Sequence, residues 1–359
     1  MKGPFAAFQG HEQVLYAADE GSGLRAIIAI HSTALGPALG GTRFFPYEDE
    51  EEALHDVLRL SEAMTYKAAV AGVDTGGGKA VIIGDPETDR SEALLRAYGR
   101  MIASLGGRYI TACDVGTVPD DMATILREAP YAVGGPPEEG GSGDSGVSTS
   151  LGTFEGIRAC AEFLWGTSAL EGRHVAVQGV GKVGYRLAHH LAAAGARLTV
   201  ADVDEDAAAH CAEETGAEVV GADKIHAVDC DIFSPNALGG VLDESSVGEL
   251  SCAVVAGAAN NQLTHPGIAD ALADAGVLYA PDYVINAGGL IQVVDELRPG
   301  GYSEARAHRR VVRIGDRIRE VAEVAHRERV STEVAAHRLA ERRIEAISRV
   351  SRLRLPRDA

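Results

Sequence analysis

Apolar residues recur at three- and four-residue steps through the segment 53–64. This period is typical of an amphipathic helix with one buried face, and Lys67 follows at the inward-pointing end of that face. The apolar, β-branched run 80–83 then predicts a buried strand. Between them, Gly76-Gly77-Gly78 stands directly before Lys79 and predicts a loop that takes positive φ or lets another group approach its backbone closely.

Strands and helices alternate through the rest of the N-terminal part. The predicted elements are strands at 24–30 and 109–112, a helix from Ser91 to Leu105, and a loop at 31–43 whose Gly36-Pro37 and Gly40-Gly41 pairs make turns. Such alternation favours a largely parallel or mixed sheet with its loops at one edge. We therefore expect Asp114, which follows the second of these strands, at the same rim as Lys79.

The C-terminal part has the pattern of a dinucleotide-binding fold. A buried strand at 174–178 leads into the run Gly179-Val180-Gly181-Lys182-Val183-Gly184, a helix at 185–194 and a second strand at 197–201. Glycines at this spacing let the backbone approach a pyrophosphate at the N-terminus of the helix, where free N–H groups favour anions. Asp202 is expected to bind the adenine-ribose hydroxyls and to repel a 2′-phosphate, which favours NAD over NADP. Asp204 is a neighbouring alternative for this role.

The glycine-rich stretch 134–146 is the predicted junction between two domains, and it acts either as a hinge or as an active-site lid. We expect an α/β protein with a mixed α/β substrate domain at 1–145 and a Rossmann (doubly wound) NAD domain at 146–331. A length of 359 residues suits two domains better than one core.

Composition and charge exclude several classes of protein. The chain is 46% apolar and 24% charged, as is ordinary for a soluble globular protein. It has neither an apolar run of about 18–20 residues nor a secretory leader pattern, so we expect a cytoplasmic location. The net charge of −19 argues against nucleic acid and anionic membranes as partners. Five scattered cysteines without a CxxC pair argue against a disulfide framework and a metal site.

Two buried lysines suit two different tasks. Burial favours the neutral amine, which a lysine needs in order to act as a general base near pH 7, although its unperturbed pKa is about 10.4. Lys79 fits this task, and Lys67 fits the binding of an anion. Taken alone, both side chains could instead snorkel to solvent, and Asp114 could cap a helix that begins near Pro119.

The run LSEAMTYKAAVAGVDTGGGKAVIIGDP, together with HSTALGPALGGTRFFPY at 31–47, resembles the glutamate/leucine/phenylalanine/valine family of amino-acid dehydrogenases, most of all its bacterial leucine and valine enzymes. The resemblance implies that Lys67 binds the substrate α-carboxylate, that Lys79 is the catalytic base and that Asp114 works with Lys79 in proton transfer. It also implies a homo-oligomer in which the final helix, at about 332–359, packs back onto the first domain.

The same resemblance assigns further contacts. Asn260, in the run GAANNQ, is expected to contact the cofactor. Glutamate-specific relatives carry, at the position of Leu39, a lysine that pairs with the substrate's second carboxylate, so leucine here favours an aliphatic substrate. Gly40 and Met64 are further predicted substrate contacts, and a helix that Asn286 opens brings Val293 towards the substrate side chain.

These features predict NAD-dependent, reversible oxidative deamination of branched-chain L-amino acids to 2-oxo acids and ammonia. One methylene is worth only about 1–3 kcal/mol in an apolar pocket, so valine, leucine and isoleucine should all react. Phenylalanine dehydrogenase and a non-catalytic NAD-binding regulatory protein remain open as alternatives. A 2-hydroxy-acid dehydrogenase would need a His/Arg pair at the substrate site, and no such pair stands beside the Rossmann elements.

Overall fold

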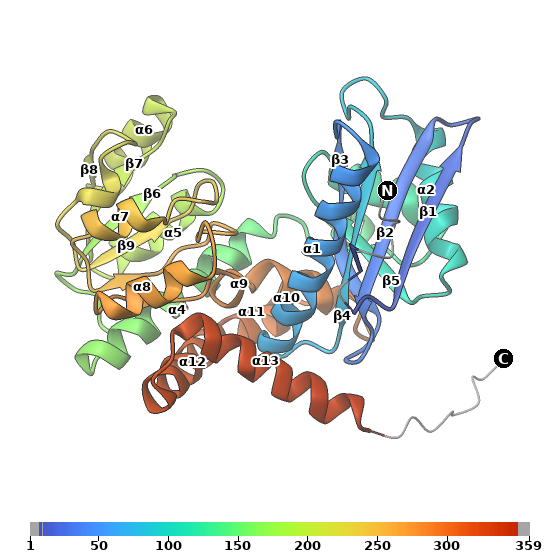
Figure 1. The fold of residues 1–359 in the computed structure, drawn as a ribbon. Helices are drawn as coiled ribbons and strands as arrows, with labels where there is room; N and C mark the ends of the chain where they lie inside the picture. Colours follow the sequence, from blue (N-terminus) through green and yellow to red (C-terminus); the bar gives the residue numbers. More distant parts are fainter. Residues whose placement is uncertain (1–6, 9, 351–359) are drawn as a thin grey trace.

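The computed structural model describes residues 7–8 and 10–350, and it contains two β-sheets in separate halves of the molecule (Figure 1). The first half, in blue and cyan, holds a five-stranded sheet, and the second half, in green and yellow, holds a six-stranded sheet. The last two helices, in red, run beneath the two halves in this view. This is the two-domain α/β architecture that the sequence predicts.

The first sheet is mixed. Its strands are β1 (Gln13–Asp19), β2 (Leu24–Ser32), β3 (Ala38–Phe45), β4 (Gly76–Ile83) and β5 (Tyr109–Cys113). They lie in the order β1-β2-β4-β3-β5. Strand β4 pairs antiparallel with β2 and parallel with β3, which in turn pairs parallel with β5. The carboxyl ends of β3, β4 and β5 therefore meet at one edge.

Helix α1 (Glu50–Val70) covers one face of this sheet. It begins after the N-cap Asp49, whose carboxylate accepts a hydrogen bond from a backbone N–H of the first turn. Its apolar stripe packs on Ile27 of β2 and Val81 of β4, as the three- and four-residue spacing predicts. The opposite face of the sheet is covered by α2 (Glu92–Ser104) and α3 (Pro119–Leu126).

Five glycines that the sequence places in loops lie inside strands instead. Gly40 and Gly41 belong to β3, Gly76–Gly78 begin β4, and none of the five has positive φ. The glycines are needed for close approach, because a Cβ at Gly40 would lie 1.7 Å from the Gly78 carbonyl oxygen. The predicted loop is therefore confirmed only around Gly36-Pro37, between β2 and β3, where Gly36 has positive φ. At Gly76–Gly78 the close approach is confirmed and the loop was wrong, so Lys79 projects from within β4.

The second sheet is entirely parallel. Its strands are β6 (His174–Gln178), β7 (Arg197–Ala201), β8 (Glu218–Val219), β9 (Ile232–Pro235), β10 (Val254–Val255) and β11 (Leu278–Tyr279), in the order β11-β10-β9-β6-β7-β8. The connecting helices are α5 (Gly184–Ala193), α6 (Glu205–Thr215), α7 (Glu244–Glu249) and α8 (Gly267–Asp274), with a 3₁₀ turn η3 (Ile225–Ala227). The strand order reverses between β6 and β9, and such a reversal places a ligand site at the carboxyl ends of these strands.

The remaining helices lie between and beneath the sheets. They are α4 (Gly146–Trp165), α9 (Asp282–Ile285), α10 (Gly288–Glu296), α11 (Glu304–Val311), α12 (Ile314–Glu328) and α13 (Thr332–Ser348), with a 3₁₀ turn η2 (Pro137–Glu139) in the glycine-rich stretch. Asn286 does not open a helix as predicted. It ends α9, and α10 begins two residues later, because the Asn286 N–H closes the last turn of α9 on the Asp282 carbonyl.

Helix α13 contacts the first half of the chain through Arg343. The Arg343 guanidinium donates to the carbonyls of Ala68, Ala69 and Val73 at 3.3, 3.1 and 2.8 Å, and to the Asp74 carboxylate at 2.7 Å. The last carbonyls of a helix have no partner within the helix itself. The N–H groups of Gly72 and Val73 already donate to the carbonyls of Ala69 and Ala68, so Arg343 adds a further donor to the C-terminal end of α1 from a distant part of the chain.

The glycine-rich stretch 134–146 is held against α10. Glu296 accepts hydrogen bonds from the N–H groups of Gly134 at 3.0 Å and Ser142 at 2.8 Å, and Gln292 Nε2 donates to the Ser142 carbonyl at 2.7 Å. The stretch joins the two halves and ends at α4.

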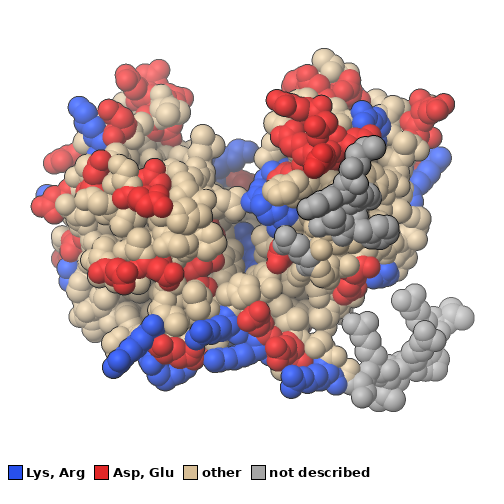
Figure 2. All heavy atoms as spheres, viewed as in Figure 1, with Lys and Arg blue, Asp and Glu red and all other residues tan. Residues whose placement is uncertain are grey.

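Charge is unevenly distributed over the surface. Figure 2 shows acidic side chains gathered at the upper ends of both halves and basic side chains along the bottom, over α12 and α13. A hollow separates the two halves at the top of this view. Within the described ranges, the helices are all too short or too polar to cross a membrane.

Candidate active site

A cavity of about 330 Å³ lies between the edge of the first sheet and the second half of the chain. Its walls come from β3, β4, β5 and α1 on one side, and from the starts of α4 and α10 and the loops after β6 and β10 on the other. The predicted site residues that line it are Leu39, Met64, Lys67, Lys79, Asp114, Val183, Asn260 and Val293. The fold thus brings together the residues that the sequence assigns to substrate binding, proton transfer and cofactor contact.

Lys79 and Asp114 form an ion pair in this cavity. Lys79 is 4% exposed, and its Nζ donates to Asp114 Oδ2. Arg43 Nε donates to the other carboxylate oxygen, Oδ1, at 3.2 Å, and Arg43 also pairs with Asp56 at 2.8 Å. Burial opposes ionisation of Asp114, but the charge and hydrogen bond of Lys79, with the Val115 N–H, outweigh it and lower the pKa of Asp114 to about 2. Asp114 is therefore held as a carboxylate.

Lys67 reaches the cavity from the last turn of α1. Its Nζ donates to Asn286 Oδ1 at 2.6 Å, and Asn286 Nδ2 donates in turn to Asn260 Oδ1 at 2.8 Å. Burial lowers the pKa of Lys67 to about 8, although the charge of the nearby Asp282 opposes this shift. The series Lys67, Asn286, Asn260 crosses from the first half of the chain to the second.

The wall beside these polar groups is apolar. Leu39 is 2% exposed, and Met64 and Val293 line the cavity with it. Among the described residues that line the cavity, positive charge comes from Lys67 and Lys79 alone. If both lysines are engaged with the reacting end of a ligand, the cavity offers no cation for a side-chain carboxylate.

Gly40 does not line this cavity. Its carbonyl accepts a hydrogen bond from Tyr109 Oη at 2.6 Å, inside the sheet, and its neighbour Gly41 lines the cavity instead. A Cβ at Gly41 would lie 2.6 Å from the Cys113 carbonyl oxygen. Both glycines therefore serve the packing of β3.

The glycine run after β6 fits a pyrophosphate. Gly179 has a φ of +85°, and a Cβ at Gly184 would lie 1.9 Å from the Gly179 carbonyl oxygen, so both positions require glycine. At Gly181, between them, a Cβ would meet no atom within 4 Å, so the space beside this backbone is open. The run ends at the N-terminus of α5, where backbone N–H groups favour an anion.

Asp202 lies beside this run, at the end of β7. Its Oδ2 accepts a hydrogen bond from the Val180 N–H at 2.7 Å, and its Oδ1 accepts one from the Asp204 N–H at 3.0 Å. Asp204, the alternative, is instead the N-cap of α6 and accepts from the N–H groups of Asp206 and Ala207. Asp202 is thus the carboxylate that faces the glycine run.

The sequence reasoning missed the residues that orient the charged groups. It assigns Asn286 only to a helix start and gives Arg43 no role. Ser145 and Thr149, at the beginning of α4, also line the cavity without having been predicted. Both residues could have been found in the sequence, because each is a polar side chain within an apolar or glycine-rich run. These runs are GGTR for Arg43 and VINAGG for Asn286.

Two family models match the chain. Residues 11–131 match the Glu/Leu/Phe/Val dehydrogenase dimerisation domain, and residues 199–349 match the Glutamate/Leucine/Phenylalanine/Valine dehydrogenase model. Valine dehydrogenase of Streptomyces virginiae is 53% identical over 93% of this chain and 94% of its own length. Leucine dehydrogenase of Geobacillus stearothermophilus is 51% identical over 94% of this chain and 91% of its own length.

Solved structures are similar over the same extent. The crystal structure of L-tryptophan dehydrogenase from Nostoc punctiforme has a TM-score of 0.85 and 47% identity, covering 95% of this chain and 98% of that one. Hetero-hexameric glutamate dehydrogenase from Thermus thermophilus has a TM-score of 0.76 and 25% identity, covering 94% of this chain and 89% of that one. The chain therefore belongs to the Glu/Leu/Phe/Val dehydrogenase family of pyridine-nucleotide-dependent oxidoreductases.

Proposed function

We propose that the protein catalyses the reversible, NAD-dependent oxidative deamination of branched-chain L-amino acids to 2-oxo acids and ammonia. The observation that carries the proposal is the convergence of Lys67, Lys79 and Asp114 in one cavity whose side wall, around Leu39, is apolar. Valine and leucine dehydrogenases that are about half identical over most of the chain support the same substrate class.

Each polar residue has a step in this reaction. Lys67, oriented by Asn286, holds the α-carboxylate by charge-assisted hydrogen bonds. Asp114 accepts a proton from the substrate ammonium, so that the amine can release hydride from Cα and become an iminium. Lys79 is an ammonium while it is paired with Asp114, so it must first release that proton to solvent, which the alkaline pH of the assay favours. The neutral amine then takes a proton from water as the water adds to the iminium carbon, and loss of ammonia gives the 2-oxo acid.

We propose NAD⁺ as the cofactor, which when bound supplies the hydride acceptor. Gly179, Gly181 and Gly184 would receive its pyrophosphate beside Val180, Lys182 and Val183, as in the glycine run predicted from the sequence. Asp202 would bind the adenine-ribose hydroxyls and repel a 2′-phosphate, which supports NAD over NADP. Asn260, at the cavity, would contact the nicotinamide end.

We further propose the division into a substrate domain at 1–145 with the last helix packed onto it, and an NAD domain at 146–331. The Arg343 contacts with the end of α1 support the first part of this division. We also propose a homo-oligomer. Support comes from the dimerisation-domain match and from β1, which is an edge strand whose Tyr16 is 47% exposed. Light scattering on purified protein tests the oligomer.

The reaction is tested by absorbance of NADH with purified protein, NAD⁺ and L-valine, L-leucine, L-phenylalanine or L-glutamate at alkaline pH. We expect turnover of valine and leucine, with glutamate inert. A preference for L-phenylalanine would show that the protein is a phenylalanine dehydrogenase instead. Binding of NAD⁺ without turnover of any amino acid would favour the regulatory protein and overturn the proposal.

Specificity is expected to change in Leu39→Lys. The new ammonium would be buried in the apolar wall, so kcat/KM for L-valine should fall by about 10- to 100-fold, while turnover of L-glutamate should appear because its side-chain carboxylate gains a partner. The same NADH assay measures both. Leu39→Met, which keeps an apolar side chain of similar volume, is the matched control and should retain valine turnover. If Leu39→Lys leaves valine turnover unchanged, Leu39 does not form the side-chain wall.

The pH profile should show the ionisation of Lys67. In the free enzyme the ammonium is present below pH of about 8 and is lost above it, because burial lowers this pKa. We therefore expect kcat/KM for L-valine to fall above that pH while kcat does not, since a bound carboxylate keeps Lys67 protonated. Lys67→Arg carries a guanidinium with a pKa above about 12 and should abolish the fall. A fall that persists in Lys67→Arg would belong to another group.

A further inference from the structure

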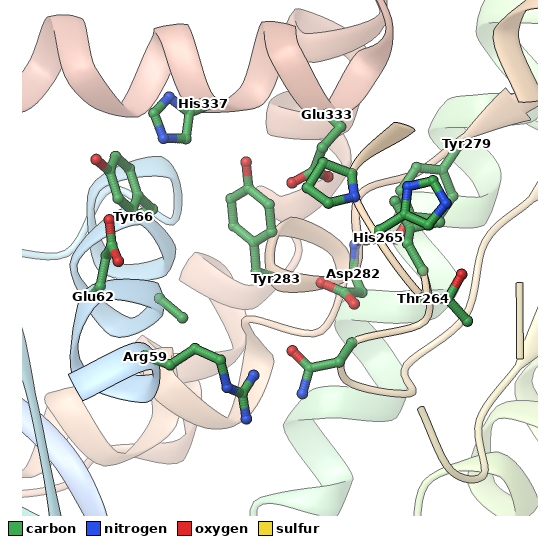
Figure 3. Close-up of a pocket in the computed structure, with 14 residues that line it drawn as sticks. Arg59, Glu62, Tyr66, Thr264, His265, Tyr279, Asp282, Tyr283, Glu333 and His337 are labelled. Carbon is green, nitrogen blue, oxygen red and sulfur yellow. Dashed lines mark hydrogen bonds between the residues drawn. The ribbon is translucent and has the colours of Figure 1, made fainter. Parts of the chain in front are cut away.

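A second cavity, of about 570 Å³, lies between α1, α9, α13 and the loop that follows β10 (Figure 3). It shares no lining residue with the active-site cavity, although Tyr66 and Asn261 in its wall are the sequence neighbours of Lys67 and Asn260. Its volume is in the range of small-molecule sites, and it is larger than the active-site cavity. The reaction proposed above does not use it.

The positive side chains of this cavity already have partners. Arg59 pairs with Asp56 at 3.1 Å, and His265 pairs with Glu244 at 2.7 Å. His337 Nδ1 lies 3.6 Å from a carboxylate oxygen of Glu341, one turn further along α13. The His337 ring also stacks on Tyr66, with the ring centroids 4.2 Å apart. An anionic ligand would have to displace one of these carboxylates.

A carboxylate and a hydroxyl in the wall of this cavity have no hydrogen-bond partner among the described residues. Glu333 has no hydrogen-bond or ion-pair partner within residues 7–8 and 10–350, and the Tyr283 hydroxyl is buried without one over the same residues. Figure 3 shows the Tyr283 ring standing between Tyr66 and Glu333, with its hydroxyl directed towards α13. An unpartnered buried hydroxyl is unfavourable unless a ligand or water satisfies it.

Two further carboxylates line this cavity. Asp282 and Glu62 line it with Glu333. Burial, and then repulsion by Asp282, raise the pKa of Glu333 to about 7. A bound cation would remove this repulsion and satisfy the Glu333 carboxylate.

We propose that this cavity binds an organic ammonium ion with an apolar or aromatic body. The ammonium donates to the Glu333 carboxylate and to the Tyr283 hydroxyl, which both line the cavity. The body of the ligand packs on Leu263 and Pro266, which also line the cavity. Because α1 belongs to the first half of the chain and the other walls to the second, the ligand bridges the two.

Isothermal titration of the full chain with 2-phenylethylammonium tests the proposal. Phenylacetate and 2-phenylethanol, with the same body and a negative or neutral head, are the matched ligands. We expect the ammonium compound to bind and Glu333→Gln to weaken it by about tenfold or more. Glu345→Gln, an exposed carboxylate on the same helix, should leave binding unchanged.

Two further measurements separate this site from the active-site cavity. Tyr283→Phe removes only the hydroxyl, so it should weaken binding even if Glu333→Gln does not fold. Binding should also persist when L-valine and NADH are present in excess. The proposal is overturned if phenylacetate binds as tightly as the amine, if Tyr283→Phe and Glu333→Gln both bind normally, or if L-valine with NADH displaces the amine.

Discussion

Replacing Lys79 by alanine is expected to lower kcat for L-valine by about a thousandfold while leaving the protein folded. General-base catalysis contributes about 10²- to 10⁴-fold, and no other described residue in the cavity is placed to take a proton from water beside Asp114. The loss should appear mainly in kcat, because Lys67 and Asn286, which hold the α-carboxylate, are unchanged. Steady-state NADH formation across a range of L-valine concentrations measures it.

Lys224→Ala is the matched control for this experiment, because Lys224 is an exposed lysine of the second half of the chain. It should retain full activity. Circular dichroism of both variants shows whether the fold is kept. If Lys79→Ala folds and retains kcat to within about tenfold, Lys79 is not the base, and the roles of Lys79 and Asp114 would have to be reassigned.

Gly77→Ala is expected to destabilise the first sheet severely. A Cβ at Gly77 would lie 2.1 Å from Thr65 Oγ1, 2.2 Å from Thr65 N and 2.5 Å from the Ser61 carbonyl oxygen. Strand β4 cannot move away, because Gly77 is paired with β2 on one side and β3 on the other. Helix α1 would have to shift, so we expect the free energy of unfolding to fall by about 3 kcal/mol, with much of the activity. Thermal denaturation measures this change.

Gly248→Ala provides the control for added volume. Gly248 lies in α7, its φ is not positive, and a Cβ there would meet no atom within 4 Å. Alanine in a helix is favoured over glycine by about 1 kcal/mol, so this variant should be as stable as the natural protein or slightly more. Equal melting temperatures for Gly77→Ala and Gly248→Ala would refute the packing argument.

The order of apolar, polar and glycine residues within one segment was sufficient to predict the long helix α1 and the glycine run between β6 and α5. The spacing of apolar residues correctly predicted α1 and the placement of Lys67 at its inward end. The glycine run was assigned correctly to a strand–turn–helix unit because β6 precedes it and α5 follows. The two-domain α/β architecture followed from the alternation of such elements, and family membership followed from the runs around Lys67 and Lys79.

Contacts between distant parts of the chain could not be predicted in the same way. Whether a glycine makes a turn or allows close packing depends on what lies opposite, and for Gly77 this is Thr65 of α1. The partner of Lys67 is Asn286, 219 positions later in the sequence. No periodicity within either segment indicates that these two side chains meet.

The Arg343 contact with α1 has a consequence for biosynthesis. The carbonyls of Ala68 and Ala69 already accept hydrogen bonds from the N–H groups of Val73 and Gly72. Their additional donor, Arg343, lies up to 275 positions further along the chain, so it is present only when ribosomes have made almost all of the described sequence. The first sheet can form earlier, since its strands are close in sequence, but the helix that carries Lys67 is secured only at the end. Chains that are released before α13 should therefore lack this contact, and the end of α1 should open more readily in them.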